Sequence, residues 1–125
     1  YTAKNSFWTL ILRDIKPMDQ LAPQMSKAWK SLDVAVLHKL ILDKILGIDE
    51  ALLAQGNNLE YVKDTPNAIS DCVSVVDKGE KQAVFFMNPP IIKQIEMVAD
   101  QGEKMPQKST YFFPKVYTGL TIDKL

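Results

Sequence analysis

The sequence contains one cysteine, one histidine and no net charge, and each of these shortages excludes a class of protein. The single cysteine, Cys72, cannot form an internal disulfide or a thiolate metal cluster within one chain, which favours a reducing compartment. Fifteen basic residues balance fifteen acidic ones, so the excess positive charge typical of nucleic-acid binders is missing. The longest apolar runs, such as residues 83–87, are far below the ~18 residues that suggest a membrane span. These absences predict a cytoplasmic protein that binds neither membranes nor nucleic acid.

The rest of the composition is that of an ordinary folded domain. The 125 residues suffice for one domain, and contents of 46% hydrophobic and 24% charged residues are close to the globular average. The chain begins at Tyr1, without an initiator methionine or a signal sequence. We therefore expect residues 1–125 to form a single domain of a longer polypeptide.

Four stretches have the apolar and β-branched character of strands. Residues 7–13 and 82–87 are apolar on both faces, which is typical of strands covered on two sides. Shorter segments at 59–63 and 119–122 also favour extended structure.

Three other stretches repeat apolar residues every three or four positions, which predicts helices over residues 33–46, 65–78 and 88–101. A glycine follows each of them, where a left-handed residue commonly ends a helix. The alternation of elements predicts an α/β class: a layered domain with three main helices and a central mixed sheet of about four strands. Two of these strands, 59–63 and 82–87, are expected to be parallel because a helix separates them.

The connection between the first strand and the first helix, residues 14–31, contains two prolines and has only weak periodicity. We expect it to be ordered, with short helical turns anchored by apolar side chains such as Met18 and Trp29.

The segment after the third helix concentrates lysine and hydroxyl side chains. Lys108, Ser109, Thr110 and Tyr111 are consecutive, and Lys115 follows. A lysine beside hydroxyl groups offers the charge and the hydrogen-bond donors that a phosphate or carboxylate requires. The segment lacks the glycines of a nucleotide-binding loop. It is either an anion-binding loop or an irregular connection whose aromatic residues pack into the core.

Two residues elsewhere are further candidates for a site. His38 lies on the inward face of the first helix, as either a core histidine or a group that exchanges a proton or orients a ligand. One histidine without cysteine or acidic neighbours predicts no metal site, and Asp33 falls about 140° away on an α-helix. Asn88 follows the strand 82–87, where it is either a helix cap or part of the crevice in which α/β sheets bind ligands.

Four short motifs point to a family. They are LDVAVLH at 32–38, EYVKD at 60–64, AVFFMNP at 83–89 and, the longest, MPQKSTYFFPK at 105–115. Together they resemble the carboxyl-terminal part of the bacterial and archaeal family called domain of unknown function 1015, over nearly all of the chain. On the family pattern, the positions carried over are Asp33, His38, Asn88, Pro89, Lys108, Ser109, Thr110, Tyr111 and Lys115.

The resemblance implies a longer parent chain whose amino-terminal part is a partner of this domain. Members of the family are often encoded beside serine-biosynthesis enzymes, which implies cytoplasmic amino-acid metabolism and a ligand such as phosphoserine or a related anion.

The sequence thus supports two hypotheses about function. The first is a cytoplasmic domain that binds, or acts on, a small anionic metabolite such as a phosphorylated one, with an unknown cofactor. The ligand-binding residues would be Lys108, Ser109, Thr110, Tyr111, Asn88 and Lys115, with His38 as the candidate catalytic group. The alternative is a non-catalytic interaction module that docks on the rest of its parent chain, or on a second copy, through Phe112, Phe113 and Tyr117.

Overall fold

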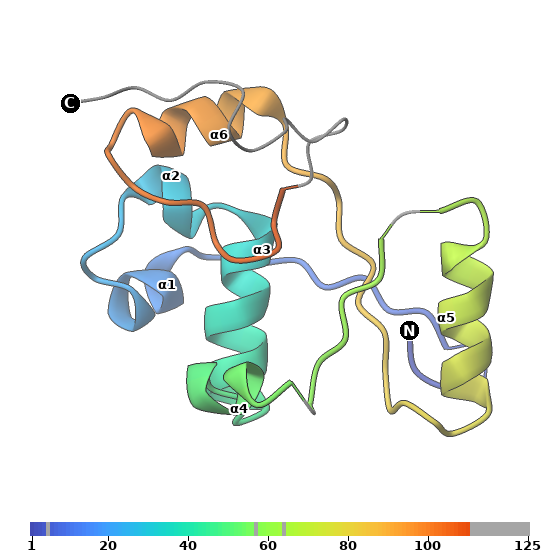
Figure 1. Cartoon of the computed structure of the whole chain (residues 1–125). Helices are drawn as coiled ribbons and strands as arrows, with labels where there is room; N and C mark the ends of the chain where they lie inside the picture. The colour runs from blue at the N-terminus through green and yellow to red at the C-terminus, as the bar shows by residue number, and fades with distance from the viewer. Residues whose placement is uncertain (5, 57, 64, 111–125) are drawn as a thin grey trace.

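The computed structural model describes residues 1–4, 6–56, 58–63 and 65–110, and the regular structure of these residues is helical. In chain order the elements are α1 (Lys16–Leu21), α2 (Lys27–Lys30), α3 (Asp33–Val36), the π-helix η1 (Leu37–Ile45), α4 (Glu50–Ala54), α5 (Ala68–Asp77) and α6 (Ile92–Ala99). Figure 1 shows α5 standing apart from the other helices, with long extended connections between them. We call the group of α1, α2, α3, η1, α4 and α6 the helical body.

The predicted layered α/β domain is wrong for the described residues, which contain no β-strand. Residues 7–13, 59–63 and 84–87 lie in the extended connections of Figure 1 without regular secondary structure, and the pairing found among the described residues is limited to isolated bridges from Thr2 to Ser6 and to Ala83. A strand must bond its N–H and C=O groups to a neighbouring strand, and the apolar character of a segment does not supply that neighbour. The predicted strand at 119–122 lies outside the described residues.

The three predicted helices are present. The first is α3 and η1 in direct succession, the second is α5 and the third is α6. The glycines after them, Gly47, Gly79 and Gly102, have φ angles of 70°, 76° and 69°. At Gly47 this left-handed turn ends η1, because the next residue, Ile48, donates its N–H back to the carbonyl of Leu42 at 2.8 Å.

Helix α6 begins four residues later than predicted. Two prolines precede it, and a residue before a proline is biased toward extended backbone, so Asn88 and Pro89 remain outside the helix. The N-cap is Ile91, whose backbone N–H donates to Oε1 of Gln94 at 3.0 Å. The alternative role of Asn88 as the helix cap is therefore wrong.

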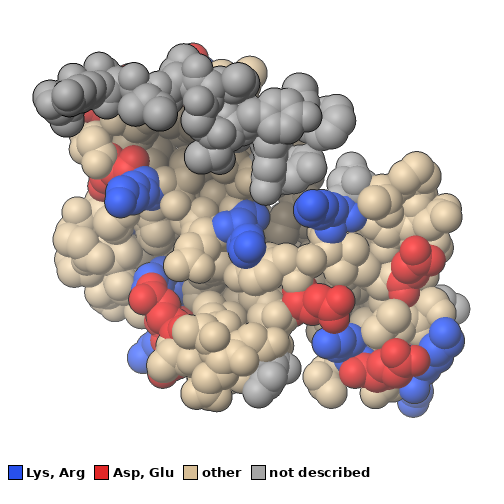
Figure 2. All heavy atoms as spheres, in the orientation of Figure 1, with Lys and Arg blue, Asp and Glu red and all other residues tan. Residues whose placement is uncertain are grey.

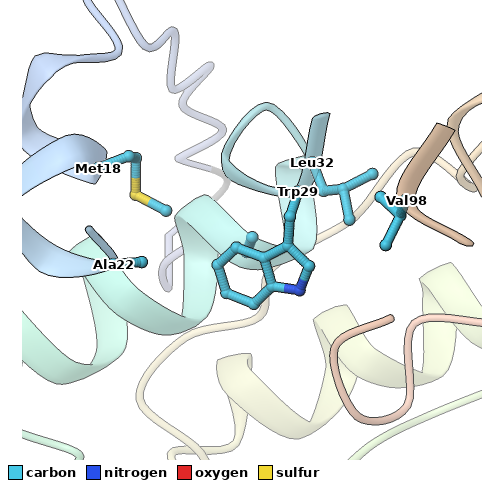
Figure 3. Packing of buried hydrophobic residues seen from close by; sticks show 6 residues of the cluster. Met18, Ala22, Trp29, Leu32 and Val98 are labelled. Atoms are coloured by element: carbon cyan, nitrogen blue, oxygen red, sulfur yellow. The ribbon is translucent and has the colours of Figure 1, made fainter. Parts of the chain in front are cut away.

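The core of the helical body forms around Trp29, as Figure 3 shows, with Met18 and Ala22 on one side and Val98 on the other. The predicted anchors Met18 and Trp29 are both buried, and the predicted short helical turns are α1 and α2. Full burial of side chains such as Met18 or Val98 stabilises the fold by about 1.5 to 3 kcal/mol each.

The amino-terminal residues pack on α5. The hydroxyl of Tyr1 donates to Oδ1 of Asp77 at 2.6 Å, and its ring centroid lies 4.6 Å from that of Phe7. The backbones of Tyr1 and Val84 exchange two hydrogen bonds, of 2.8 and 3.0 Å. This second region therefore has its own small contact surface, separate from the core around Trp29.

The extended connections expose their apolar side chains. Trp8 is 73% exposed and Ile11 is 79% exposed, so the prediction that residues 7–13 are covered on both faces is wrong. Phe86 and Met87, in the run predicted to be a central strand, are also exposed. In the described ranges, no helix is long and apolar enough to cross a membrane.

Candidate functional site

A cavity of about 610 Å³ lies between η1, α4, the extended residues near Tyr61 and residues 104–108, which we call the lysine turn. Its lining consists of Met25, Trp29, His38, Lys39, Asp43, Ile48, Glu50, Leu53, Ala54, Tyr61 and the lysine turn. Another cavity, of about 460 Å³ between α2 and α6, has one charged side chain, Lys27, in its lining. Because functional sites gather titratable groups in a concave surface, the larger cavity is the candidate site.

The π-helical geometry of η1 brings two of the lining residues to one face. Residues of a π-helix pair five positions apart, as the hydrogen bond of 2.9 Å from the N–H of Leu46 to the carbonyl of Ile41 shows. His38 and Asp43 are also five apart, so they lie near the same face, whereas an α-helix would separate them by about 140°. Turns of this rare kind occur frequently at functional sites.

Side-chain hydrogen bonds fasten the start of the lysine turn to α2. The carboxylate of Glu103 accepts from the backbone N–H of Ser26 at 2.5 Å and from its hydroxyl at 2.6 Å. The indole N–H of Trp29 donates to the carbonyl of Lys104 at 3.1 Å. Lys104 is thus held beside the core while its own side chain stays exposed.

The end of the lysine turn is closed by Ser109. Its hydroxyl donates to the carbonyl of Pro106 at 2.6 Å, across a turn in which Lys108 has a φ of 58°. A left-handed backbone is uncommon for a residue with a side chain and costs of order 1 kcal/mol, and such conformations cluster at binding sites. The arrangement places Lys108, like Lys104, on the rim of the cavity.

The charges around the cavity fall into two groups. Nζ of Lys39 lies 2.8 Å from Oε1 of Glu50, so these two largely neutralise each other. Lys104, Lys108 and Asp43 make no ion pair with any residue that the structure describes. The unpaired side chains therefore give this cavity a small excess of positive charge. Over the face shown in Figure 2, by contrast, acidic and basic side chains are interspersed.

His38 is half-buried at the cavity wall, with the ring of Tyr61 at a centroid distance of 6.3 Å. Burial and, next in size, the Lys39 ammonium lower the pKa of His38 below its ordinary value, and Glu50 acts in the opposite direction. At neutral pH the imidazole is consequently uncharged and has one donor and one acceptor nitrogen. It can orient a ligand or accept a proton without adding to the positive charge.

The structure brings some of the candidate residues predicted from the sequence together and separates others. His38 and Lys108 line one cavity, although seventy positions separate them in the chain. Ser109 and Thr110 follow the lysine turn and are partly buried, and the Ser109 hydroxyl is used within the turn. Asn88 is exposed and is not among the lining residues, while Tyr111 and Lys115 lie outside the described residues.

Six further residues of the lining were not assigned to a site from the sequence: Lys39, Asp43, Glu50, Tyr61, Lys104 and Gln107. The first two stand on the same helix as His38, so a π-helical reading of that helix would have signalled Asp43. Tyr61 and Glu50 come from separate segments, and no local pattern marks them.

No protein-family model, curated protein or solved structure matches the chain. The resemblance to domain of unknown function 1015 stays a prediction, and the function is inferred from the cavity.

Proposed function

We propose that the chain is a binding domain for a small anion of the carboxylate or phosphate-monoester class, held in the cavity beside the lysine turn. The observation that carries the proposal is that Lys104 and Lys108 line one cavity and neither has an acidic partner among the described residues. An anion bound there would gain charge-assisted hydrogen bonds from both ammonium groups.

The surroundings support this class of ligand. Lys39 is already paired with Glu50, so it does not compete for the anion with the two lysines of the turn. The neutral His38, which lines the same cavity from η1, offers a hydrogen bond from a different segment of the chain. The phosphorylated metabolite expected from the family resemblance belongs to the same chemical class, and the single cysteine supports the cytoplasm as the compartment.

Thermal unfolding with inorganic phosphate, phosphoglycolate and succinate tests the proposal. A ligand that binds only the folded chain at a hundred times its Kd adds about 2.7 kcal/mol to the free energy of unfolding. We expect Lys108→Ala to lose this shift. Lys93→Ala, which removes an exposed lysine on α6, should retain it. Alanine is preferred to glycine at position 108 because it meets the same left-handed backbone cost as lysine.

The absence of a shift with all three anions, or equal shifts in the wild type and Lys108→Ala, would overturn the proposal.

A second candidate function is that of an interaction module, and the extended segment 7–13 favours it. Its backbone makes no hydrogen bond to any described residue, and its apolar side chains are exposed. An exposed, unpaired strand of this kind pairs readily with a strand of another polypeptide. The occupant would be a second copy of the chain, because residues 7–12 carry no charge and can lie antiparallel to themselves across a two-fold axis.

Light scattering over a wide range of concentrations tests this candidate. The mass should rise toward that of a dimer, and Ile11→Lys should keep the chain monomeric while leaving its melting temperature unchanged at low concentration. A wild-type chain that stays monomeric throughout would contradict self-association. The remaining occupant of the segment would then be the rest of a longer parent chain.

A further inference from the structure

The cavity contains one acidic group that anion binding leaves unused. Asp43, on η1, lines the same space as Lys104 and Lys108 and is partly buried. The other carboxylate of the lining, Glu50, is engaged by Lys39 at 2.8 Å. Among the residues that the structure describes, Asp43 is therefore the unpaired negative charge of this lining, opposite in sign to the two lysines.

The spacing of these charges matters as much as their signs. Asp43 forms no ion pair with a described lysine, so the carboxylate and the ammonium groups do not neutralise each other directly. They come from different walls, since Asp43 belongs to η1 whereas the lysines belong to the turn fastened to α2 by Glu103. Asp43 lies partly buried without a cationic partner among the described residues, so a cationic group in the cavity would donate a charge-assisted hydrogen bond to its carboxylate.

We infer that the ligand is a zwitterion of amino-acid size, whose anionic group binds Lys104 and Lys108 and whose ammonium group binds Asp43. The inference rests on the proposed function, because it assigns the second pole of the same ligand. The volume of about 610 Å³ is within the range of small-molecule sites.

Two residues near Asp43 on η1 are compatible with a cationic group bound at this wall of the cavity. His38 lies on the same face of η1 and is uncharged at neutral pH, so it does not repel an ammonium and can accept a hydrogen bond from it. Lys39 stands next to His38 in the chain, and its charge is compensated by Glu50. The Asp43 wall is consequently the less positive side of the cavity.

Calorimetric binding of two matched pairs of probes tests the inference. Aspartate and phosphoserine carry an ammonium group, and malate and phosphoglycerate carry a hydroxyl in its place. We expect wild type to bind the ammonium member of each pair about tenfold more tightly or better, as charged hydrogen bonds permit. Asp43→Asn, which keeps the shape of the side chain, should bring the ratio close to one and leave phosphoglycerate affinity unchanged or higher. Asp71→Asn, at an exposed site on α5, should keep the wild-type preference.

The outcomes separate the two ideas. Equal binding of both members of each pair by the wild type, or a preference that survives in Asp43→Asn, would overturn the zwitterion and leave the anion site standing. A failure of all four probes to bind would instead remove the anion site, and the inference with it. Loss of binding to every probe in Lys108→Ala, with the fold intact, is expected under both.

Discussion

The helical body and the extended connections both contain large apolar side chains, but only the helical body buries them. In the body, Met18 and Val98 are buried around Trp29, whereas in the connections Trp8 and Ile11 face outward. A helix bonds its own backbone and needs a partner only along one stripe, while a strand needs a neighbour for its backbone as well as cover for its side chains. The comparison shows that apolar character does not by itself bury a residue. The residue enters the core only where another element covers it.

The cavity lies where these two regions meet. Helices α2, η1 and α4 of the helical body line it together with the lysine turn, and Tyr61 comes from the extended residues 59–63. The ring of Tyr61 packs near His38, so one of the exposed connections takes part in shielding a titratable group of the body. The contrast between the two regions can therefore be tested by the free energy of unfolding of variants in each region and by the titration of His38.

The largest expected effect is a difference between two leucines, one from each region. Leu32 is 1% exposed in the core, and Leu10 is 65% exposed in the segment 7–13. Leu32→Ala should lower the free energy of unfolding by about 2 to 5 kcal/mol, because it removes packed methyl groups and leaves a cavity. Leu10→Ala should change it by no more than about 0.5 kcal/mol. Urea unfolding of both variants measures the difference.

Equal losses in the two variants would contradict the comparison. Such a result would mean that Leu10 is covered in solution, for example by a second copy of the chain. Repeating the unfolding measurements at a lower protein concentration would then distinguish the two kinds of cover. The loss in Leu10→Ala should become small on dilution only if a separate molecule covers Leu10.

A smaller effect is expected at the hydrogen bonds that hold the lysine turn to α2. Glu103→Ala removes both bonds to Ser26 and should cost about 1 to 3 kcal/mol, the usual range for partly buried bonds to a charged group. Glu96→Ala, on the exposed face of α6, is the matched control and should be nearly neutral. Thermal unfolding of the two variants measures this, and equal melting temperatures would show that the turn is held by other contacts.

The sequence predicted the helices and failed on the sheet for one physical reason. Helical signals are local, so the stripe within 33–46 and the glycine at 47 sufficed to place α3 and η1. The sequence of an extended segment does not identify the strand with which it pairs. Among the described residues, none pairs with residues 7–13. The π-helical form of η1 was also invisible, because apolar residues at three- and four-residue steps fit an α-helix equally well.

The candidate site was predictable only in part for the same reason. His38 and Lys108 were predicted as site residues from their residue types and from their neighbours in the sequence. Their common cavity depends on the turn of the chain that Glu103 fastens to Ser26, a contact between residues 77 positions apart. Asp43 was missed because its proposed role depends on two lysines that line the same cavity but come from a distant part of the chain.

The smallest expected effect concerns the pH dependence of the free energy of unfolding, through His38 at the contact between the two regions. Because the folded chain lowers the pKa of His38 below its ordinary value of 6.5, protonation costs more free energy in the folded state than in the unfolded state. The contribution of His38 to stability is therefore fully present above about pH 6.5 and is lost as the pH falls through the unfolded pKa toward the folded one. His38→Asn should flatten the unfolding curve in that window. The paired carboxylate of Glu50, whose pKa is lowered from 4.5 chiefly by its hydrogen bond to Lys39, acts only at lower pH.

Tyr61→Ala should sharpen this result, since it removes the aromatic ring that lies beside His38. With less burial the pKa of His38 should rise toward 6.5, because burial is the largest cause of its lowering. His38 is the only histidine of the chain, so its imidazole signal in a proton NMR titration needs no assignment. An unchanged titration midpoint in Tyr61→Ala would show that the helical body shields His38 by itself and that the ring of Tyr61 adds nothing to this shielding.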